Sequence, residues 1–492
     1  MIYNFNLGIG WASSGVEYAQ AYRAKMFRNI HKKAKFIFTD MMPYENIEHM
    51  TKNIGFYDSE VEWLYTFFTD FKIEPVTYTL SDFKKTMSQK DYQFSRDGKI
   101  ARFVFENENS FYTAYMVDET SDLLHRVEYV SQGCLIRKDY FTSARIFTEY
   151  YAPLENRAHL YHRRFFNQDG SVAYEEVIDG DSSLYKFKDR VFYSKEELVG
   201  YMVAKLSLTK KDTVIIDRST QIGQPILMNC RDAKVGIVVH ADHFSENSCD
   251  ENVILWNNYY EYDFNMAKHI DFYICSTDAQ SQLLKTHFKK YKNLSPNIYT
   301  IPVGGLTELK YPKTTRKPFS VITASRLANE KHVDWIIQAV VLAHEEYPEM
   351  NLDIYGKGGE EDKLKQLISK NNASDYIRLM GQQDLSDVYQ NYEVYLSGST
   401  SEGFGLSLME AIGAGLPIVG FDVRYGNPTF IHDGKNGFLL PMYSKDMDKI
   451  HALKDGLIRV FQSNLEEMHK ESYRIGKKYL TREVQKRWKS IV

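Results

Sequence analysis

Residues 397–417, SGSTSEGFGLSLMEAIGAGLP, combine residue types that could bind a phosphate and a sugar. Glu402 and Glu410 flank an expected helix start near Leu406, and between them lie Gly403, Phe404 and Gly405. Glycines let the backbone approach a ligand closely, and the first N–H groups of a helix lack internal partners and carry partial positive charge. We therefore expect a phosphate at the helix start, with a carboxylate accepting hydrogen bonds from sugar hydroxyls. A glycine-rich turn capped by an acid is the alternative.

Two cations follow another expected strand. In SVITASRLANEKH the strand ends at about Ser325, and Arg326 and Lys331 come after it, five residues apart. Cations at the carboxyl end of a strand could neutralise a diphosphate, although most surface arginines and lysines are simply solvated. The nearby acidic loop favours the diphosphate. Gly356, after the apolar run NLDIY, is included among the expected donor-binding residues.

Histidines and acids give weaker indications of chemistry. His240 ends the apolar run KVGIVVH, and His243 follows three residues later. This spacing alone does not define a zinc site, so we expect His240 to contact a bound sugar, with a buried structural histidine as the alternative. Asp179 and Asp181, in DGD, lie between two alternating segments and are expected to form a hairpin turn. The sequence therefore predicts no metal site.

A glycine-rich loop opens the chain at residues 6–20, NLGIGWASSGVEYAQ. Its glycines are spaced G-x-G-x4-G, unlike the G-x-G-x-x-G of dinucleotide-binding folds, although Asp40 ends the next strand where such folds place an acid. The spacing alone therefore leaves open whether this loop holds a dinucleotide, another phosphate or no ligand.

The elements that must position these residues follow a βα rhythm interrupted by an alternating block. Residues 1–71 and 205–303 predict strands alternating with helices, and 72–204 alternates apolar and polar residues between turn clusters, which is typical of an antiparallel meander. A second βα series occupies 304–470, and 471–492 is an amphipathic helical region expected to cross back to the N-terminal domain. We predict an α/β protein of two doubly wound domains facing a cleft, with a β insertion in the first. Parallel sheets of this kind bind ligands beyond the carboxyl ends of their strands.

The composition narrows the class of protein. The 492 residues carry 61 Lys and Arg against 65 Asp and Glu, a net charge of −4, so no general basicity points to nucleic acid. Four cysteines lie far apart without a C-x-x-C pair, which suits a reducing cytoplasm. The N-terminus lacks the features of a signal peptide, and no apolar run is long enough to span a bilayer. We expect a cytoplasmic protein, with peripheral attachment to the membrane left open.

The motif E-G-F-G-L-x-L-M-E, preceded by A-S-R-L-x-x-E-K, resembles the donor-site signature of retaining GT-B glycosyltransferases of family 4. The chain also resembles a narrower group, the catalytic subunit of the accessory-secretion-system glycosyltransferases of Gram-positive bacteria. That group places the first sugar, typically N-acetylglucosamine, on Ser and Thr of serine-rich repeat adhesins. The resembling segments include NLGIGWASSGVEYAQAYRA, KFIFTDM, IRKDYF, VVHADHFSEN, ILWNNYY, TASRLANEKH and STSEGFGLSLMEAIGAGLP.

The resemblance implies a role for each candidate residue. Arg326 and Lys331 would hold the UDP diphosphate, Glu410 would accept the ribose hydroxyls, and Glu402 would contact the transferred sugar. Backbone N–H groups would support sugar and phosphate at Phe404, Gly405 and Leu406. His240 would face the sugar from the N-terminal side. Ser13, Ser14, Gly15 and the following helix start would line the cleft near the acceptor and the donor phosphate.

The resemblance also implies partners and a mechanism. The insertion would help bind a homologous, non-catalytic partner subunit together with the acceptor polypeptide. Transfer would retain the α configuration by front-face substitution, without a metal or other cofactor. The sequence leaves open the sugar, N-acetylglucosamine or glucose. It also leaves open three other functions: glucosylation of poly(glycerol phosphate) teichoic acid, non-catalytic binding of a sugar nucleotide, and a dinucleotide oxidoreductase.

Overall fold

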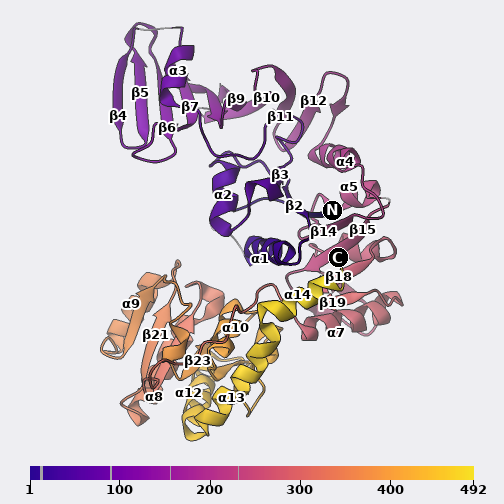
Figure 1. The fold of residues 1–492 in the computed structure, drawn as a ribbon. Helices are drawn as coiled ribbons and strands as arrows, with labels where there is room; N and C mark the ends of the chain where they lie inside the picture. The colour runs from indigo at the N-terminus through magenta and orange to yellow at the C-terminus, as the bar shows by residue number, and fades with distance from the viewer. Residues whose placement is uncertain (11–14, 89–90, 156, 231) are drawn as a thin grey trace. The chain divides into compact units, whose positions relative to one another are not determined.

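The computed structural model describes residues 1–10, 15–88, 91–155, 157–230 and 232–492, and Figure 1 follows its elements along the chain. Within these ranges the chain forms two compact units. The first consists of Met1–Val238 and Trp256–Asp271, and the second of Val239–Leu255 and Phe272–Val492. Ser13 and Ser14, which we expected beside the ligand, lie outside the described residues.

Five parallel strands of the first unit are hydrogen-bonded in the order β15-β14-β1-β2-β3. They are β1 (Ile2–Asn6), β2 (Ala34–Phe38), β3 (Val61–Trp63), β14 (Thr213–Ile216) and β15 (Lys234–Val239). All residues of β14 are buried, as expected of a parallel strand covered on both faces. The helical segments are α1 (Gly15–Asn29), α2 (Ile47–Ile54), η1 (Asp58–Glu60), α4 (Lys195–Lys205), α5 (Gly223–Asn229), α6 (Glu261–Asn265) and η3 (Ala267–His269). The expected strand–helix–strand start of the chain is confirmed.

A buried ion pair fixes α1 against this sheet. Arg23, on α1, places Nη2 2.7 Å from Oδ1 of Asp217, which directly follows β14, and the two side chains are 4% and 0% exposed. Gln20, one helical turn earlier, donates to the other carboxylate oxygen at 2.7 Å. Because a buried carboxylate needs several donors, this pairing sets the position of the helix that follows the glycine loop.

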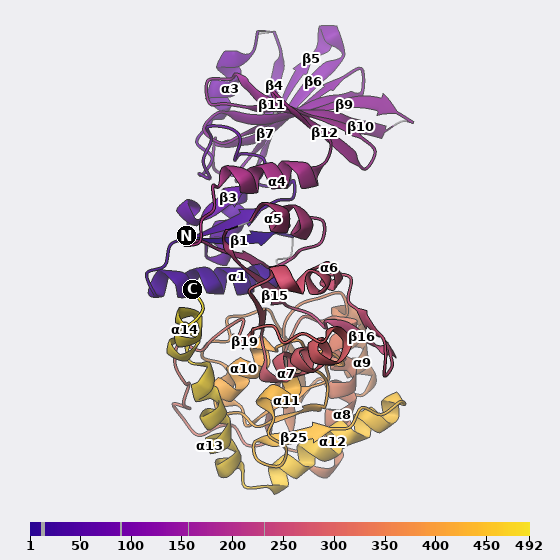
Figure 2. The ribbon, with the colours of Figure 1, turned by 90° about the vertical axis from the view of Figure 1, so that its right-hand side faces the viewer.

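Ten antiparallel strands follow one another in chain order, which confirms the expected meander (Figure 2). They are β4 (Gln93–Asp97), β5 (Ile100–Phe105), β6 (Ser110–Met116), β7 (Leu124–Ser131), β8 (Cys134–Phe141), β9 (Arg145–Leu154), β10 (Arg157–Phe166), β11 (Val172–Asp179), β12 (Ser182–Lys186) and β13 (Val191–Phe192), with a single helical turn, η2 (Glu106–Glu108). Residues of β5 alternate between exposed and buried, because successive side chains of a strand point to opposite faces. Phe83 of the helix α3 (Leu80–Thr86) packs edge-on against the buried Phe103, with the two ring centres 5.8 Å apart. Asp179 and Asp181 flank the turn between β11 and β12, as expected.

The second unit contains a six-stranded parallel sheet in the order β22-β21-β20-β23-β24-β25. Its strands are β20 (Ser320–Ala324), β21 (Asn351–Tyr355), β22 (Ile377–Gly381), β23 (Val394–Ser397), β24 (Ile418–Phe421) and β25 (Gly437–Leu440). The chain adds strands on one side of β20 and then continues on the other side with β23. Ligands of such sheets bind where the order reverses, at the carboxyl ends of the strands.

Helical segments lie between and after these strands in the sequence. They are η5 (Asn329–Lys331), α8 (Val333–Glu346), α9 (Glu361–Lys370), η6 (Tyr389–Asn391), α10 (Leu406–Gly413), α11 (Gly426–Phe430), α12 (Asp446–Gln462), α13 (Leu465–Gly476), η7 (Lys477–Tyr479) and α14 (Thr481–Lys489). The unit also holds α7 (Asp278–His287), η4 (Phe288–Lys292) and the parallel pair β18 (Phe272–Cys275) and β19 (Ile298–Thr300), and β16 (Phe244–Cys249) pairs with β17 (Ile254–Trp256). Arg487 of α14 donates to the carbonyl of Thr300 in β19 at 3.2 Å. The C-terminal helix therefore contacts a strand of the 205–303 segment, although the limits expected for the domains remain a prediction.

No helix within the described ranges is both long and apolar enough to cross a membrane.

Candidate functional site

The structure brings Lys331 and Glu402 together at the point where the strand order reverses. Lys331 lies in the loop after β20, and Glu402 lies in the loop after the neighbouring β23. The Nζ atom of Lys331 is 2.6 Å from Oε2 of Glu402, with the two side chains 16% and 17% exposed. Ser399 donates to the same carboxylate oxygen at 3.4 Å. A cation and a carboxylate, distant in the sequence, thus form a single charged centre at the carboxyl edge of the sheet.

Arg326 follows the same strand but does not join this pair. Its side chain is 79% exposed, and Nη2 lies 3.1 Å from Oε1 of Glu330, four residues later. An exposed pair of this kind contributes little stability, so the guanidinium can exchange Glu330 for a stronger anion at small cost.

The helix expected near Leu406 begins there. Gly405 precedes α10 with a positive φ of +87°, and the helix start has no side-chain cap. A Cβ atom at Gly405 would lie 2.6 Å from Cδ1 of Leu408, so glycine is required by both conformation and space. The uncapped N–H groups of α10 make its start suitable for an anion.

Glu410 lies one turn into α10, beside Tyr389. The hydroxyl of Tyr389 donates to Oε2 of Glu410 at 3.1 Å. The Glu410 residue keeps exposed surface, yet the protein atoms around its carboxyl raise its pKa, chiefly by desolvation. A carboxyl in a crevice that is still open to solvent can accept hydrogen bonds from a ligand.

Backbone contacts explain two glycines near the site. A Cβ atom at Gly356 would lie 1.9 Å from the carbonyl oxygen of Ser325, and one at Gly398 would lie 2.6 Å from that of His332. These glycines let the loops after β21 and β23 pack against the loop after β20. The structure thus gives Gly356 a packing role, and its expected contact with the donor stays a prediction.

The segment after β24 holds Glu402 in place, and our sequence reasoning did not include it. The N–H of Glu402 donates to the carbonyl of Arg424 at 3.1 Å, and the N–H groups of Tyr425 and Gly426 donate to the carbonyl of Glu402 at 2.6 and 2.7 Å. The sequence signal was present, because RYGNP follows the apolar run PIVGFD at a strand end, and its Gly, Asn and Pro residues are typical of the point where a strand gives way to another element.

The two histidines differ in environment. His240 follows β15, and its carbonyl lies close to the acidic loop, since a Cβ atom at Gly403 would approach it to 3.3 Å. His243 is fully buried, with Nε2 3.0 Å from Nδ1 of His287, and burial lowers its pKa to about 3. His243 is therefore the neutral structural histidine, and His240 is the one that lies beside Gly403. The described residues include no cluster of three or more His, Cys, Asp or Glu suited to a metal ion.

Asp40, the acid after the glycine loop, has partners within the described part of the first unit. Asp40 forms an ion pair with Lys195, and Trp63 donates its indole N–H to the Asp40 carbonyl at 2.8 Å. A Cβ atom at Gly8 would lie 3.1 Å from Cβ of Asp40, so this glycine is needed for close packing. Gly15 is the first residue of α1, and among the described residues no atom lies within 4 Å of where its Cβ would stand.

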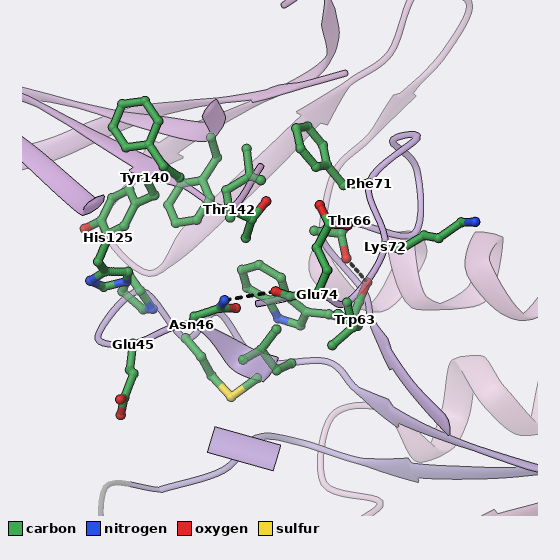
Figure 3. Close-up of a pocket in the computed structure, with 17 residues that line it drawn as sticks. Glu45, Asn46, Trp63, Thr66, Phe71, Lys72, Glu74, His125, Tyr140 and Thr142 are labelled. Atoms are coloured by element: carbon green, nitrogen blue, oxygen red, sulfur yellow. Dashed lines mark hydrogen bonds between the residues drawn. The ribbon is translucent and has the colours of Figure 1, made fainter. Parts of the chain in front are cut away.

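Figure 3 shows a cavity at the base of the insertion, lined largely by apolar and aromatic side chains, among them Trp63, Phe71 and Tyr140. Its volume is about 20 Å³, which is room for about one water molecule. Asn46 donates to the carbonyl of Glu74 at 3.1 Å along its wall. This cavity is a packing junction and is too small for a nucleotide or a sugar.

Two protein families match the chain. Residues 93–189 match the GtfA extended beta-sheet domain, and residues 308–478 match the glycosyl transferases group 1. The UDP-N-acetylglucosamine–peptide N-acetylglucosaminyltransferase GtfA subunit of Streptococcus gordonii is 52% identical over the whole chain and 98% of the relative.

Solved structures agree with these matches. The pneumococcal O-GlcNAc transferase GtfA in complex with UDP and GlcNAc has a TM-score of 0.91 and 49% identity, covering 99% of this chain and 97% of that one. A GtfA/B complex contains a chain with a TM-score of 0.96 and 52% identity, covering 100% and 98%. TarM, at 19% identity and a TM-score of 0.70, shares the fold. The expected GT-B fold is confirmed.

Proposed function

Because the chain belongs to the family of GtfA subunits of UDP-N-acetylglucosamine–peptide N-acetylglucosaminyltransferases, we propose that it transfers N-acetylglucosamine from UDP to Ser and Thr hydroxyls of a serine-rich repeat adhesin. The observation that carries this proposal is the Lys331–Glu402 pair beside the uncapped start of α10. Relatives at about half identity over their full length carry the same activity in their names.

The donor would bind across the loops after β20 and β23. Lys331 and Arg326 would neutralise the diphosphate, and the first N–H groups of α10 would donate to it. Glu410 would accept the ribose hydroxyls, and Glu402 would accept from the sugar. His240 would approach the sugar from the other side of Gly403, since its carbonyl already lies next to that glycine.

The reaction breaks the bond between the sugar C1 and the phosphate oxygen and forms a bond from C1 to the acceptor oxygen on the same face. The hydroxyl proton moves to the departing phosphate oxygen. The protein's main task is then to stabilise negative charge that grows on UDP, and fixed cations and helix N–H groups do this best where water is excluded. We propose that Lys331 and Arg326 supply this positive charge without a metal ion.

The insertion would bind a homologous, non-catalytic partner subunit together with the acceptor polypeptide. A structure named as a GtfA/B complex contains a chain 52% identical to this one, which supports a heteromeric assembly. All four cysteines are free, which suits work in the cytoplasm. Attachment to the membrane surface stays a prediction.

The alternatives receive less support. The poly(glycerol-phosphate) alpha-glucosyltransferase of Bacillus subtilis is 25% identical over half of this chain, far below the peptide-modifying relatives. A protein that only binds a sugar nucleotide is less favoured because the relatives at 44–52% identity are named as transferases. An oxidoreductase would need the acid that Lys195 already pairs.

Mass spectrometry of a serine-rich peptide tests the proposal. The chain, with and without the partner subunit, is incubated with UDP-N-acetylglucosamine or UDP-glucose, and poly(glycerol phosphate) serves as a competing acceptor. We expect N-acetylhexosamine on the peptide. Exclusive transfer to the phosphate polymer, or no transfer with either donor, would contradict the proposal.

A further inference from the structure

A second cavity, larger than that of Figure 3, lies on one face of the ten-stranded sheet. It measures about 480 Å³, within the range of pockets that bind ligands. Side chains from α3 and from β6, β7 and β8 line it, and the turn between β10 and β11 contributes at one end. We call it the insert pocket and define it by Tyr112, Tyr129, Arg137, Asp139 and Arg145.

The carboxylate in this pocket has no remaining capacity for a ligand. Asp139 is 2% exposed. Its Oδ1 accepts from Nε of Arg137 at 2.8 Å and from the hydroxyl of Thr148 at 2.5 Å. Its Oδ2 accepts from Nη2 of Arg137 at 2.5 Å and from the hydroxyl of Tyr129 at 2.8 Å. A carboxylate offers about four lone-pair sites, and donors of the protein fill them all.

The arginines, in contrast, still have donors to offer. Arg137 uses Nε and Nη2 on Asp139, and its guanidinium lies 4.8 Å from the ring centre of Tyr129. Nη1 of Arg145 lies 3.8 Å from Oδ2 of Asp139, and Cζ of Arg145 lies 4.1 Å from the ring centre of Phe166. The two side chains are 31% and 33% exposed. One positive charge of this pair exceeds what Asp139 neutralises, and aromatic contacts restrain both guanidinium groups.

The side-chain amides that line the pocket are already engaged with other protein groups. Asn167 donates to the hydroxyl of Ser171 at 3.1 Å, and Gln168 donates to the carbonyl of Asp70 at 3.3 Å. The pocket lining also carries the hydroxyl groups of Tyr78, Thr86, Ser88 and Tyr112, and its positively charged donors are the guanidinium groups of Arg137 and Arg145. The positive charge that Asp139 does not neutralise, set between aromatic rings, suits a carboxylate on an apolar stem.

We propose that the insert pocket binds an acidic side chain of the polypeptide acceptor, so that carboxylates in the acceptor raise its affinity. This inference rests on the proposed function, because it takes the acceptor to be a polypeptide. A peptide carboxylate is favoured over a phosphate polymer since the relatives named for peptide transfer match at 44–52% over the full length, and those named for phosphate polymers match at 25–27% over less of the chain.

Two peptides that differ at one position test the proposal. One serine-rich peptide carries glutamate near its serines, and the other carries glutamine. Binding to the full chain and to its complex with the partner subunit is measured by fluorescence anisotropy of the labelled peptide at low and high salt, alongside KM and kcat for transfer. We expect the glutamate peptide to bind about fivefold more tightly at low salt, with the difference shrinking at high salt.

Arg145→Gln should abolish the preference for glutamate, so that the variant binds the two peptides equally well. The matched control is Arg102→Gln, which removes an exposed arginine of β5 outside the pocket and should keep the preference. Arg137→Lys tests the second cation while retaining the positive charge beside Asp139.

Each other outcome overturns the inference. Equal binding of both peptides to the unaltered chain does so. An equal preference for the glutamate peptide in Arg145→Gln and Arg102→Gln does so as well. Displacement of the glutamate peptide by poly(glycerol phosphate) or N-acetylglucosamine, but not by an unlabelled glutamate peptide, assigns the pocket to another ligand. Loss of affinity for the partner subunit in Arg145→Gln alone assigns the pocket to the interface between the two proteins. Failure of transfer to both peptides instead contradicts the proposed function, while the anisotropy still reports on the pocket.

Discussion

The pairing of Lys331 with Glu402 predicts opposite effects of neutralising its two members on UDP binding. The two charged atoms are 2.6 Å apart and about one sixth of each side chain is exposed. If Lys331 binds the diphosphate, UDP must compete with Glu402 for the same ammonium group. A carboxylate next to the diphosphate also repels it.

The magnitudes follow from this geometry. Lys331→Gln removes a charge-assisted hydrogen bond to the diphosphate, worth about 1.5–3 kcal/mol, so the Kd for UDP should rise by about 10- to 100-fold. Glu402→Gln removes the competing partner. A partly exposed ion pair contributes about 1 kcal/mol net, so the Kd should fall by up to about fivefold. Transfer should nevertheless be lost in Glu402→Gln, because the neutral amide oxygen is a weaker acceptor for the sugar hydroxyls than the carboxylate it replaces.

Isothermal titration calorimetry with UDP, at one ionic strength, measures both constants. Lys370→Gln, which neutralises an exposed lysine at the end of α9, is the matched control and should bind UDP like the unaltered chain. The reasoning is refuted if Glu402→Gln weakens UDP binding as much as Lys331→Gln does.

Four further predictions follow from the same structure. Arg326→Ala should lower the transfer rate by about 10²–10³-fold. Its melting temperature should stay unchanged, because the Arg326 side chain forms an exposed ion pair. Steady-state kinetics and calorimetry check both expectations, and an unchanged rate would remove Arg326 from the site. Gly356→Ala should lower the melting temperature or the soluble yield because its Cβ would overlap the Ser325 carbonyl, whereas Gly359→Ala, with open space, should not; equal stability of the two variants would contradict the packing argument. Deleting the ten antiparallel strands, residues 93–192, leaves α4 in place and should preserve UDP binding by calorimetry but abolish peptide modification; full modification by the shortened chain would exclude the strands from acceptor handling. The pKa of His243 is lowered to about 3 in the folded chain, so the unfolded chain binds an extra proton and stability is lost as the pH falls below about 6.5. At pH 5 the lost stability amounts to about 2 kcal/mol. His243→Gln should therefore reduce the difference in unfolding midpoint between pH 7.5 and pH 5, and an unchanged difference would count against a buried neutral histidine.

The elements of the fold were predictable where local patterns are strong. Unbroken apolar runs such as Thr213–Ile216 mark parallel strands, and alternation such as that of Ile100–Phe105 marks the meander. Both patterns follow from the burial of one or two faces of a strand, so they are written in neighbouring residues.

The site was predictable only in part, because contacts between distant residues leave little local signal. The spacing of Glu402 and Glu410 around a glycine-capped helix start could be read directly. The contact of Lys331 with Glu402 required the order of β20 and β23, and the support of Glu402 by Arg424–Gly426 required the position of β24. The buried position of His243 depends on His287, a residue of α7 that no motif connects with it.

A structure of the chain with UDP bound is the most direct test of the central claim. We predict that the diphosphate lies between the ammonium group of Lys331 and the first N–H groups of α10, with the ribose hydroxyls on Glu410. Density for UDP at the glycine loop of the first unit, or anywhere without contact to Lys331, would contradict the assignment of this site.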